Sequence, residues 1–375
     1  LTVSNGNYGG AISGSGSLNK NGSGSLVLTG VSNLSGASSV SAGTLYVNGA
    51  GVLGTPSLTV ASGASLGGSG ILDGAVSIAD GGHVIVNSGS TLTTGALTLN
   101  NASNLDAFLG APVPGAAGLL KVNGNLVLDG RLNVSNAGGF GLGVYRLIDY
   151  TGSLTDNGLA LGALPSGLTV ADLQVQTSVG NQVNLVVGGA ADGVLFWSGN
   201  AGGNGGNGVW GGAASSWSNA SGNFTQGWND GFAVFQGGAG TVTVEGSQTT
   251  TGLQFIADGY VLAAGNAGAL NLLDSSAGYT GVRVGSGNTA TVNVNLNGSG
   301  TLNKLEAGTL VLNGNNSYSG GTRLNGGTLV LGSNSALGSG TLTATNASVL
   351  DSNRAVTLGN AVLLDGGLLI GGSNA

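Results

Sequence analysis

The chain contains the stretch Gly14-Ser15-Gly16-Ser17-Leu18-Asn19-Lys20, which returns 284 positions later as Gly298-Ser299-Gly300-Thr301-Leu302-Asn303-Lys304. The register continues without a gap, so that residues 14–59 align with residues 298–343, with 20 identities in 46 aligned positions. Self-similarity built from short strand-like pieces is typical of solenoid proteins, in which each repeat packs against its neighbours. The duplication therefore predicts a β-solenoid.

Short runs of alternating apolar and polar residues dominate the sequence around the repeats. Examples are residues 25–29 and 44–48, each bounded by Gly on both sides, and residues 57–60, which follow Pro56. Such alternation indicates half-buried strands, and Gly and Asn suit the sharp bends between strands because they tolerate positive φ. The constant spacing between the two copies favours stacked coils over a β-sandwich. We therefore expect an all-β parallel solenoid.

The composition is far from that of an ordinary globular domain, because 78 of the 375 residues are Gly and only 6% are charged. Typical domains have about 25% charged residues and about 7% Gly. Hydrophobic residues still make up 41% of the chain, which disordered sequences do not reach. The chain therefore has enough apolar material for a core, and its surface is expected to consist of Ser, Thr, Asn and Gly.

Charge and hydropathy exclude two classes of partner. The formal net charge is −7 and the eight Lys and Arg residues never cluster, whereas nucleic-acid-binding proteins present a basic patch. No apolar run approaches the roughly 18–20 residues of a membrane-spanning helix, so we expect no membrane insertion by this chain. The sequence enters strand-like residues directly at Leu1 and contains no Cys, which fits an interior or mature segment of an exported protein.

Changes in residue usage predict three segments. Residues 1–189 are expected to form a β-helix block with the first copy of the repeat, and residues 238–375 a second block with the other copy. Residues 190–237 between them are expected to be an aromatic-rich insert or interblock segment. This segment contains Trp197, Trp210, Trp217 and Trp228 together with Phe196, Phe224, Phe232 and Phe235.

The repeat resembles the passenger-associated strand repeat of type V autotransporter passenger domains. The second copy fits the family pattern G-T-L-x-L-x-G-x-N-x-Y-x-G-G-T almost throughout, because it reads Gly308-Thr309-Leu310-Val311-Leu312-Asn313-Gly314-Asn315-Asn316-Ser317-Tyr318-Ser319-Gly320-Gly321-Thr322. The first copy departs from this pattern where Leu34 replaces Tyr318 and Ala37 replaces Gly321. The Trp-rich stretch from Leu195 to Phe235 also resembles a segment that precedes such repeats in large passengers.

The resemblance implies a right-handed parallel β-helix with an aromatic-rich interruption, on the outside of a Gram-negative cell and exported through an outer-membrane barrel. Such passengers are commonly adhesins or aggregation and biofilm factors. We therefore expect a non-enzymatic extracellular protein of the bacterial cell surface. Its expected partners are other copies of itself, with surface glycans as a second class.

A structural subunit that polymerises end to end into an extracellular fibre or sheath is the alternative. Open coil ends are unpaired strand edges, so a solenoid without caps is prone to stack on another copy. Polar caps at the ends of the solenoid would favour the adhesin, and bare apolar ends would favour the fibre.

One stretch formally matches a catalytic motif. Gly63-Ala64-Ser65-Leu66-Gly67 fits the nucleophile elbow of hydrolases, with Asp73 or Asp80 and then His83 following in hydrolase order. That motif requires a strand–turn–helix, and the local pattern predicts strand–turn–strand. We therefore expect an ordinary solenoid turn and a surface histidine.

The remaining candidates for chemistry are also weak. Gly203-Asn204-Gly205-Gly206-Asn207-Gly208 fits a dinucleotide-binding motif, but no helix follows to hold a phosphate. It also resembles a calcium-binding roll in which Asn207 stands in place of the Asp ligand. Glycan cleavage would need carboxylates with basic partners, and the nearest pairs are Asp73 with Asp80, Asp149 with Asp156 and Asp351 with Asp365. No catalytic, cofactor-binding or metal-ligating residue is assigned, and no cofactor is expected.

The four Trp residues allow two interpretations. Exposed Trp faces stack on sugar rings and would form a binding surface, whereas buried ones would fill a widened core or an interblock cap. We favour the core.

Overall fold

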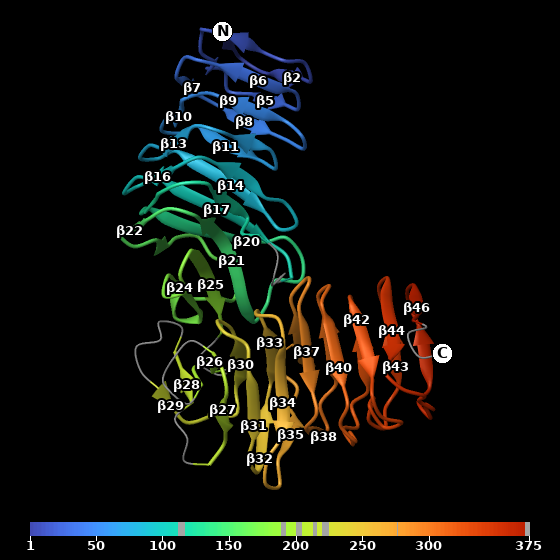
Figure 1. Ribbon diagram of the computed structural model, residues 1–375. Helices are drawn as coiled ribbons and strands as arrows, with labels where there is room; N and C mark the ends of the chain where they lie inside the picture. Colours follow the sequence, from blue (N-terminus) through green and yellow to red (C-terminus); the bar gives the residue numbers. More distant parts are fainter. Residues whose placement is uncertain are drawn as a thin grey trace. The chain divides into compact units, whose positions relative to one another are not determined.

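The computed structural model describes residues 1–111, 117–188, 193–199, 205–212, 216–219, 225–275 and 277–371. The chain divides into two compact units, each built from short stacked strands (Figure 1). Unit 1 comprises Leu1–Ala111, Ala117–Phe140 and Arg146–Leu185, whereas unit 2 includes Gly141–Tyr145 and the chain from Val186 onward. Within the described residues, no helix is long and apolar enough to cross a membrane.

Unit 1 has three faces, because each coil adds one strand to each of three sheets. Sheet 1 contains β1 (Thr2–Val3), β4 (Asn19–Lys20), β7 (Ser38–Val40), β10 (Ser57–Val60), β13 (Ala75–Ile78), β16 (Leu97–Leu99), β19 (Leu126–Leu128) and β22 (Leu154–Asp156). Sheet 2 contains β2 (Gly6–Tyr8), β5 (Ser25–Leu28), β8 (Thr44–Val47), β11 (Ser65–Gly68), β14 (His83–Asn87), β17 (Asn104–Leu109), β20 (Arg131–Asn136) and β23 (Ala160–Leu161).

Sheet 3 forms the third face, and a short 3₁₀ helix, η1 (Val170–Asp172), precedes its edge strand β24. In spatial order it contains β24 (Leu173–Gln176), β25 (Gln182–Val187), β21 (Gly143–Tyr150), β18 (Leu120–Val122), β15 (Leu92–Thr94), β12 (Ile71–Leu72), β9 (Val52–Gly54), β6 (Val31–Leu34) and β3 (Ser13–Gly14).

The interior of unit 1 is a ladder of apolar side chains. Leu26, Leu45, Leu66, Val84 and Leu105 are register partners on successive parallel strands of sheet 2. All five are buried, since the period-2 alternation of each strand turns the same positions inward. The parallel β-helix predicted from the sequence is thereby confirmed.

Unit 2 continues the same architecture with different sheets. Sheet 4 contains β29 (Thr225–Gln226), β28 (Trp217–Ser218), β26 (Val194–Trp197), β30 (Phe232–Phe235), β33 (Gly252–Phe255), β36 (Thr280–Val284), β39 (Leu302–Leu305), β41 (Thr322–Leu324), β43 (Leu342–Ala344) and β45 (Val362–Leu364). Sheet 5 contains β27 (Gly208–Trp210), β31 (Thr241–Val244), β34 (Tyr260–Ala264), β37 (Thr289–Val292), β40 (Thr309–Leu312), β42 (Thr328–Leu331), β44 (Ser348–Ser352) and β46 (Leu368–Ile370). Sheet 6 contains β32 (Ser247–Thr250), β35 (Ala269–Leu272) and β38 (Asn295–Gly298).

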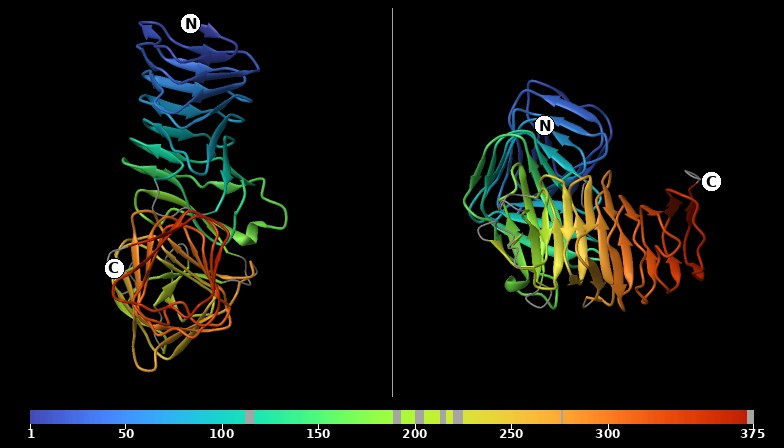
Figure 2. Two further views of the ribbon diagram at one scale, coloured as in Figure 1. Left: turned by 90° about the vertical axis from the view of Figure 1, so that its right-hand side faces the viewer. Right: turned by 60° about the horizontal axis from the view of Figure 1, so that its bottom comes forward.

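Seen along the axis of unit 2, the coils wind around one interior (Figure 2, left). One apolar cluster runs through this interior from Leu195 to Leu350. The Trp-rich segment begins the unit, and there the otherwise parallel pairing is replaced by antiparallel pairs between β26, β28 and β29. Phe224 lies outside the described residues.

The outer face of sheet 4 also carries apolar residues. The segment Gly141–Tyr145, which belongs to unit 2, covers them. The cluster consists of Val144, Val186, Phe196, Phe232 and Val234. Gln254 holds the covering segment, because its Oε1 accepts a hydrogen bond from the Val144 N–H at 2.8 Å and its Nε2 donates to the Val144 carbonyl at 3.1 Å. The side-chain amide thus takes the place of a neighbouring strand.

Candidate interaction surfaces

Each copy of the repeat places a lysine in the interior of its coil. Lys20 is the register partner of Val40, and Lys304 is the register partner of Leu324, so both lysines occupy inward positions. Both side chains are 0% exposed. Burial lowers the pKa of both ammonium groups, in Lys304 to about 8. The sequence had given no sign that these two cations lie in the core.

A column of asparagines runs along one corner of unit 2. Nδ2 of Asn313 donates to Oδ1 of Asn293 at 2.8 Å, and Nδ2 of Asn353 donates to Oδ1 of Asn313 at 2.9 Å. Asn293 and Asn353 are exposed. Gly332 lies in the coil between Asn313 and Asn353. An added Cβ at Gly332 would come within 1.9 Å of Asn313 Oδ1. The missing side chain therefore lets the amide ladder pass over one coil.

A second polar column lies beside the first. The Asn315 N–H donates to Oδ1 of Asn295 at 2.9 Å, and Oγ of Ser317 donates to Oδ1 of Asn297 at 2.8 Å. Oδ1 of Asn315 in turn accepts hydrogen bonds from Oγ of Ser333 and Ser335 in the next coil, at 2.6 and 3.4 Å. Asn295, Asn315 and Ser317 are all exposed. Because each coil repeats at about 4.8 Å, the columns present a regular array of amide donors and acceptors.

The outer face of sheet 2 brings together part of the catalytic arrangement considered from the sequence. Ser65 and His83 are register partners on adjacent strands, and Nδ1 of His83 lies 2.7 Å from Oδ2 of Asp106. The carboxylate that contacts His83 is therefore that of neither Asp73 nor Asp80. Oδ1 of Asp80 instead accepts a hydrogen bond from the Ala102 N–H. Sequence reasoning missed Asp106, although its separation of 23 residues from His83 is about one coil.

The backbone at Ser65 does not suit acyl transfer. The elbow would use the N–H of the following residue as an oxyanion donor, and here that residue is Leu66, which is buried in the sheet between its register partners Leu45 and Val84. Ser65 also lies in strand β11, between strands on both sides, rather than on a strand–turn–helix elbow. The local structure is the strand–turn–strand expected, and His83 is half-buried on the sheet surface.

The glycine-rich candidate for phosphate or calcium lies partly outside the described residues, since Gly203 and Asn204 are not among them. In the described part, Oδ1 of Asn207 accepts a hydrogen bond from the Thr241 N–H at 2.7 Å, and Gly208 begins strand β27. Asn207 therefore has a structural role. Among the residues that the structure describes, no group of three His, Cys, Asp or Glu is placed to hold a metal ion.

The Trp side chains form a core rather than a sugar-stacking surface. Trp197, Trp210 and Trp217 are at most 1% exposed. The ring of Trp217 packs edge-on against those of Trp197 and Trp210, with centroid distances of 5.1 and 5.0 Å. Trp228 is half-buried and packs against Trp217 at 4.4 Å. The core interpretation is the one that the structure bears out.

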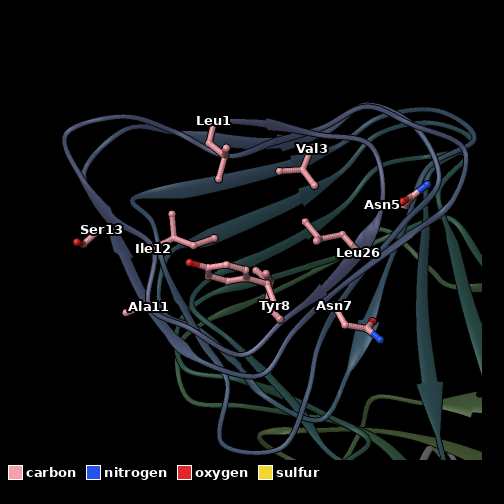
Figure 3. Close-up of a pocket in the computed structure, with 11 residues that line it drawn as sticks. Leu1, Val3, Asn5, Asn7, Tyr8, Ala11, Ile12, Ser13 and Leu26 are labelled. Carbon is pink, nitrogen blue, oxygen red and sulfur yellow. The ribbon is translucent and has the colours of Figure 1, made fainter.

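The first coil of unit 1 has an open apolar mouth (Figure 3). Its hollow has a volume of about 520 Å³, and the side chains of Leu1, Val3, Tyr8, Ile12 and Leu26 point into it. The last described coils of unit 2 also expose apolar residues, namely Val362, Leu363, Leu364, Leu369 and Ile370.

A shallower, polar hollow of about 480 Å³ spans three successive turns of unit 1. Asn101, Asp129, Arg131 and Asn157 line it together with Gly130, Gly158 and neighbouring residues. It offers a guanidinium, a carboxylate and two amides on one concave surface.

A parallel β-helix with duplicated turns and outward amide columns is typical of a passenger-type β-helix. Residues 18–47 and 302–331 match the passenger-associated-transport-repeat family (PATR). Over 349 residues the chain is 42% identical to a protein named Adhesin BmaC autotransporter from Brucella suis biovar 1 (strain 1330), covering 84% of this chain and 10% of the relative. No solved structure gives a significant match.

These similarities confirm that the chain is an autotransporter passenger segment with passenger-associated repeats. Both matched segments contain one of the two buried lysines. Passenger domains of this class are exposed at the bacterial cell surface, so the expected extracellular location is also confirmed. The chain spans about a tenth of the length of the curated relative that it matches.

Proposed function

We propose that this segment acts as a non-enzymatic adhesive surface that binds other copies of itself along its polar columns. The observation that carries the proposal is the exposed amide ladder of Asn293, Asn313 and Asn353. An amide bound to its neighbour in the same ladder still has donor and acceptor capacity directed outward. The name of the similar Brucella suis protein, an adhesin, supports the same class of function.

The composition of the surface favours contact between like copies. With 6% charged residues and a net charge of −7 over 375 residues, two copies repel each other weakly. Each amide contact contributes little by itself, but repeating it along the axis raises the overall affinity through multiplicity. Weak polar contacts can therefore produce stable adhesion without a deep binding pocket.

Analytical ultracentrifugation of the purified chain over a range of concentrations tests this proposal. The variant with Asn293→Ala, Asn313→Ala and Asn353→Ala is expected to associate at least about tenfold more weakly. The matched control is Asn104→Ala with Asn133→Ala, which removes an amide pair with a 3.2 Å hydrogen bond from the outer face of unit 1. Equal association of the two variants would contradict self-association through the corner of unit 2.

End-to-end stacking into a fibre is the second candidate function that we propose, because the coils of a parallel β-helix stack on one another through their strand edges. A coil of one copy would meet a coil of another as neighbouring coils meet within one chain, through backbone hydrogen bonds and inward apolar side chains. Electron microscopy across concentrations distinguishes the two modes, because stacking gives continuous filaments and lateral adhesion gives bundles or clusters. Ile12→Asp and Leu369→Asp are each expected to abolish filaments. Discrete particles of the unaltered chain at every concentration rule stacking out.

Surface glycans are a second class of partner that we propose, and the polar hollow beside Arg131 supports them. Guanidinium, carboxylate and amide groups hydrogen-bond to sugar hydroxyls, which are both donors and acceptors. A glycan array compared with the variants Arg131→Ala and Asp129→Ala tests this. Arg354→Ala, on unit 2, is the control. Binding that survives both substitutions in the hollow excludes it as the glycan site.

A further inference from the structure

The buried ammonium of Lys304 is held by two successive turns of unit 2. Its Nζ donates to the carbonyl of Leu305, the last residue of β39, at 2.9 Å and to that of Glu306, in the turn that follows, at 2.8 Å. It also donates to the carbonyl of Gly326 at 3.2 Å, in the turn of the next coil. One side chain therefore joins the backbones of two coils.

Two of these three contacts recur in the first copy of the repeat. Nζ of Lys20 donates to the carbonyl of Gly22 in its own turn and to that of Ala42 in the next coil, the latter at 2.9 Å. Gly22 aligns with Glu306 and Ala42 aligns with Gly326. Because the two copies lie in different units, this geometry belongs to the repeat and does not depend on one set of neighbours.

The turn that receives the ammonium from the preceding coil is one residue shorter than the turns on either side. In unit 1 the short turn is 41–43, between register positions of sheets 1 and 2, and its neighbours are 21–24 and 61–64. In unit 2 the short turn is 325–327, and its neighbours are 305–308 and 345–348. The lysine therefore faces a turn of distinct length in both copies.

A glycine next to the contacted carbonyl makes the approach possible. Gly43 and Gly327 both have φ of +66°, a conformation that residues with a side chain rarely adopt. An added Cβ at Gly43 would come within 2.7 Å of Lys20 Nζ and 2.3 Å of the Gly24 carbonyl oxygen. At Gly327 it would come within 2.4 Å of the Gly308 carbonyl oxygen. The buried lysine and the positive-φ glycine beside its acceptor carbonyl therefore occur together in both copies.

We propose that the lysine of each passenger-associated repeat is a clamp that fixes the register between its own coil and the next coil. Most coils present inward Leu and Val side chains, which fit one another in many stacking orders. A buried ammonium is stable only where carbonyl oxygens replace its water, and the short turn supplies one of them. A single buried polar group sets register in the same way in coiled coils, at a cost in stability. This role is independent of what the surface binds.

Hydrogen exchange of the full chain, followed by mass spectrometry, tests the clamp. Two amides report on it, because the Asn325 N–H donates to the Lys304 carbonyl at 2.9 Å and the Thr328 N–H to the Gly308 carbonyl at 3.2 Å. In Lys304→Met both are expected to exchange roughly tenfold faster. The matched control is Lys121→Met, which removes an exposed lysine from β18. Exchange that is unchanged or slower in Lys304→Met overturns the proposal.

The first copy keeps the proposal testable if Lys304→Met fails to fold. Lys20→Met and Gly43→Ala alter coils near the start of unit 1, where local opening leaves later coils intact. The reporting amides are those of Ser41 and Thr44, which donate to the Lys20 and Gly24 carbonyls at 2.7 and 3.2 Å. Both variants are expected to accelerate exchange there, although Gly43→Ala leaves the lysine in place. Protection retained in both variants refutes the clamp.

A disulfide trap reports on register directly, since the chain has no Cys. Ser25 and Thr44 are register partners on adjacent strands, at a spacing of about 4.8 Å that suits a disulfide. Cys at both positions should cross-link during oxidative refolding, and Lys20→Met in this background should lower the yield several-fold. An unchanged yield means that the lysine does not set the register.

Discussion

Arg283 and Glu306 form an ion pair in the interior of unit 2, with 3.4 Å between Nη1 and Oε1 and side chains only 5% and 2% exposed. The Glu306 backbone carbonyl also accepts a hydrogen bond from Lys304, so three ionisable groups lie close together in the interior. Burial raises the pKa of Glu306 to about 8, although Arg283 and Lys304 oppose this rise. Burial lowers the pKa of Lys304 to about 8, against the opposing effect of Glu306.

These buried groups predict that unit 2 is least stable near pH 8. Glu306 binds its proton more tightly when folded, so its contribution is fully present below its ordinary pKa of 4.5 and is lost as the pH rises to about 8. Lys304 binds its proton less tightly when folded, so stability returns as the pH rises from about 8 to 10.5. Urea unfolding followed by Trp fluorescence measures this. The free energy of unfolding near pH 8 should lie about 2 kcal/mol below its values at lower and higher pH.

Two variants separate the contributions. Glu306→Gln is expected to flatten the profile between about pH 5 and 8, and Lys304→Met to flatten it between about pH 8 and 10. If the free energy of unfolding of the unaltered chain only rises or only falls with pH, the assignment of the minimum to Glu306 and Lys304 is wrong.

Gln254→Leu is expected to release the segment that covers sheet 4. The substitution leaves the N–H and the carbonyl of Val144 buried without partners, which costs about 2 kcal/mol. The control Gln248→Leu removes a single hydrogen bond to the Glu245 carbonyl from a half-buried side chain and should cost less. Denaturant unfolding gives the energies, and hydrogen exchange at residues 141–145 should accelerate in Gln254→Leu alone. Equal effects of the two variants would show that the paired contact to Val144 has no special weight.

Trp217→Ala should be among the most damaging substitutions in the aromatic core. Trp217 is buried between Trp197 and Trp210, and removing such a ring costs about 3–5 kcal/mol through lost burial and the cavity left behind. Trp228→Ala, at a half-buried position, is expected to cost less, even though its Nε1 donates to the Thr249 carbonyl at 2.7 Å. Chemical denaturation of both variants tests the order, and a larger loss in Trp228→Ala would contradict the packing described.

Gly332→Ala should break the asparagine column. The new methyl group would occupy the place of Asn313 Oδ1, so we expect a loss of about 1–3 kcal/mol from overpacking. Gly359→Ala is the matched control, because an added Cβ there meets open space. Thermal unfolding compares the two, and an equally small shift in both would mean that the amide ladder yields without cost.

Several features were predictable from residue pattern alone. Alternation marked Leu26 and Leu45 as inward, and the 284-residue duplication indicated stacked coils. The aromatic segment was correctly interpreted as core, since large apolar rings are costly to leave in water. The partner of His83 could not be found in this way, because Asp106 reaches it only once the residues per coil are known.

The sequence by itself determined the β-helical fold and the repeat, because side-chain period and glycine-rich turns are local properties. Only the tertiary structure decided that Lys20 and Lys304 lie inside the coils. A lysine in a polar stretch looks like any surface cation until the next coil brings a carbonyl to its ammonium. Contacts of that kind depend on the length of each turn, which sets which backbone atoms meet across coils some twenty residues apart in the chain.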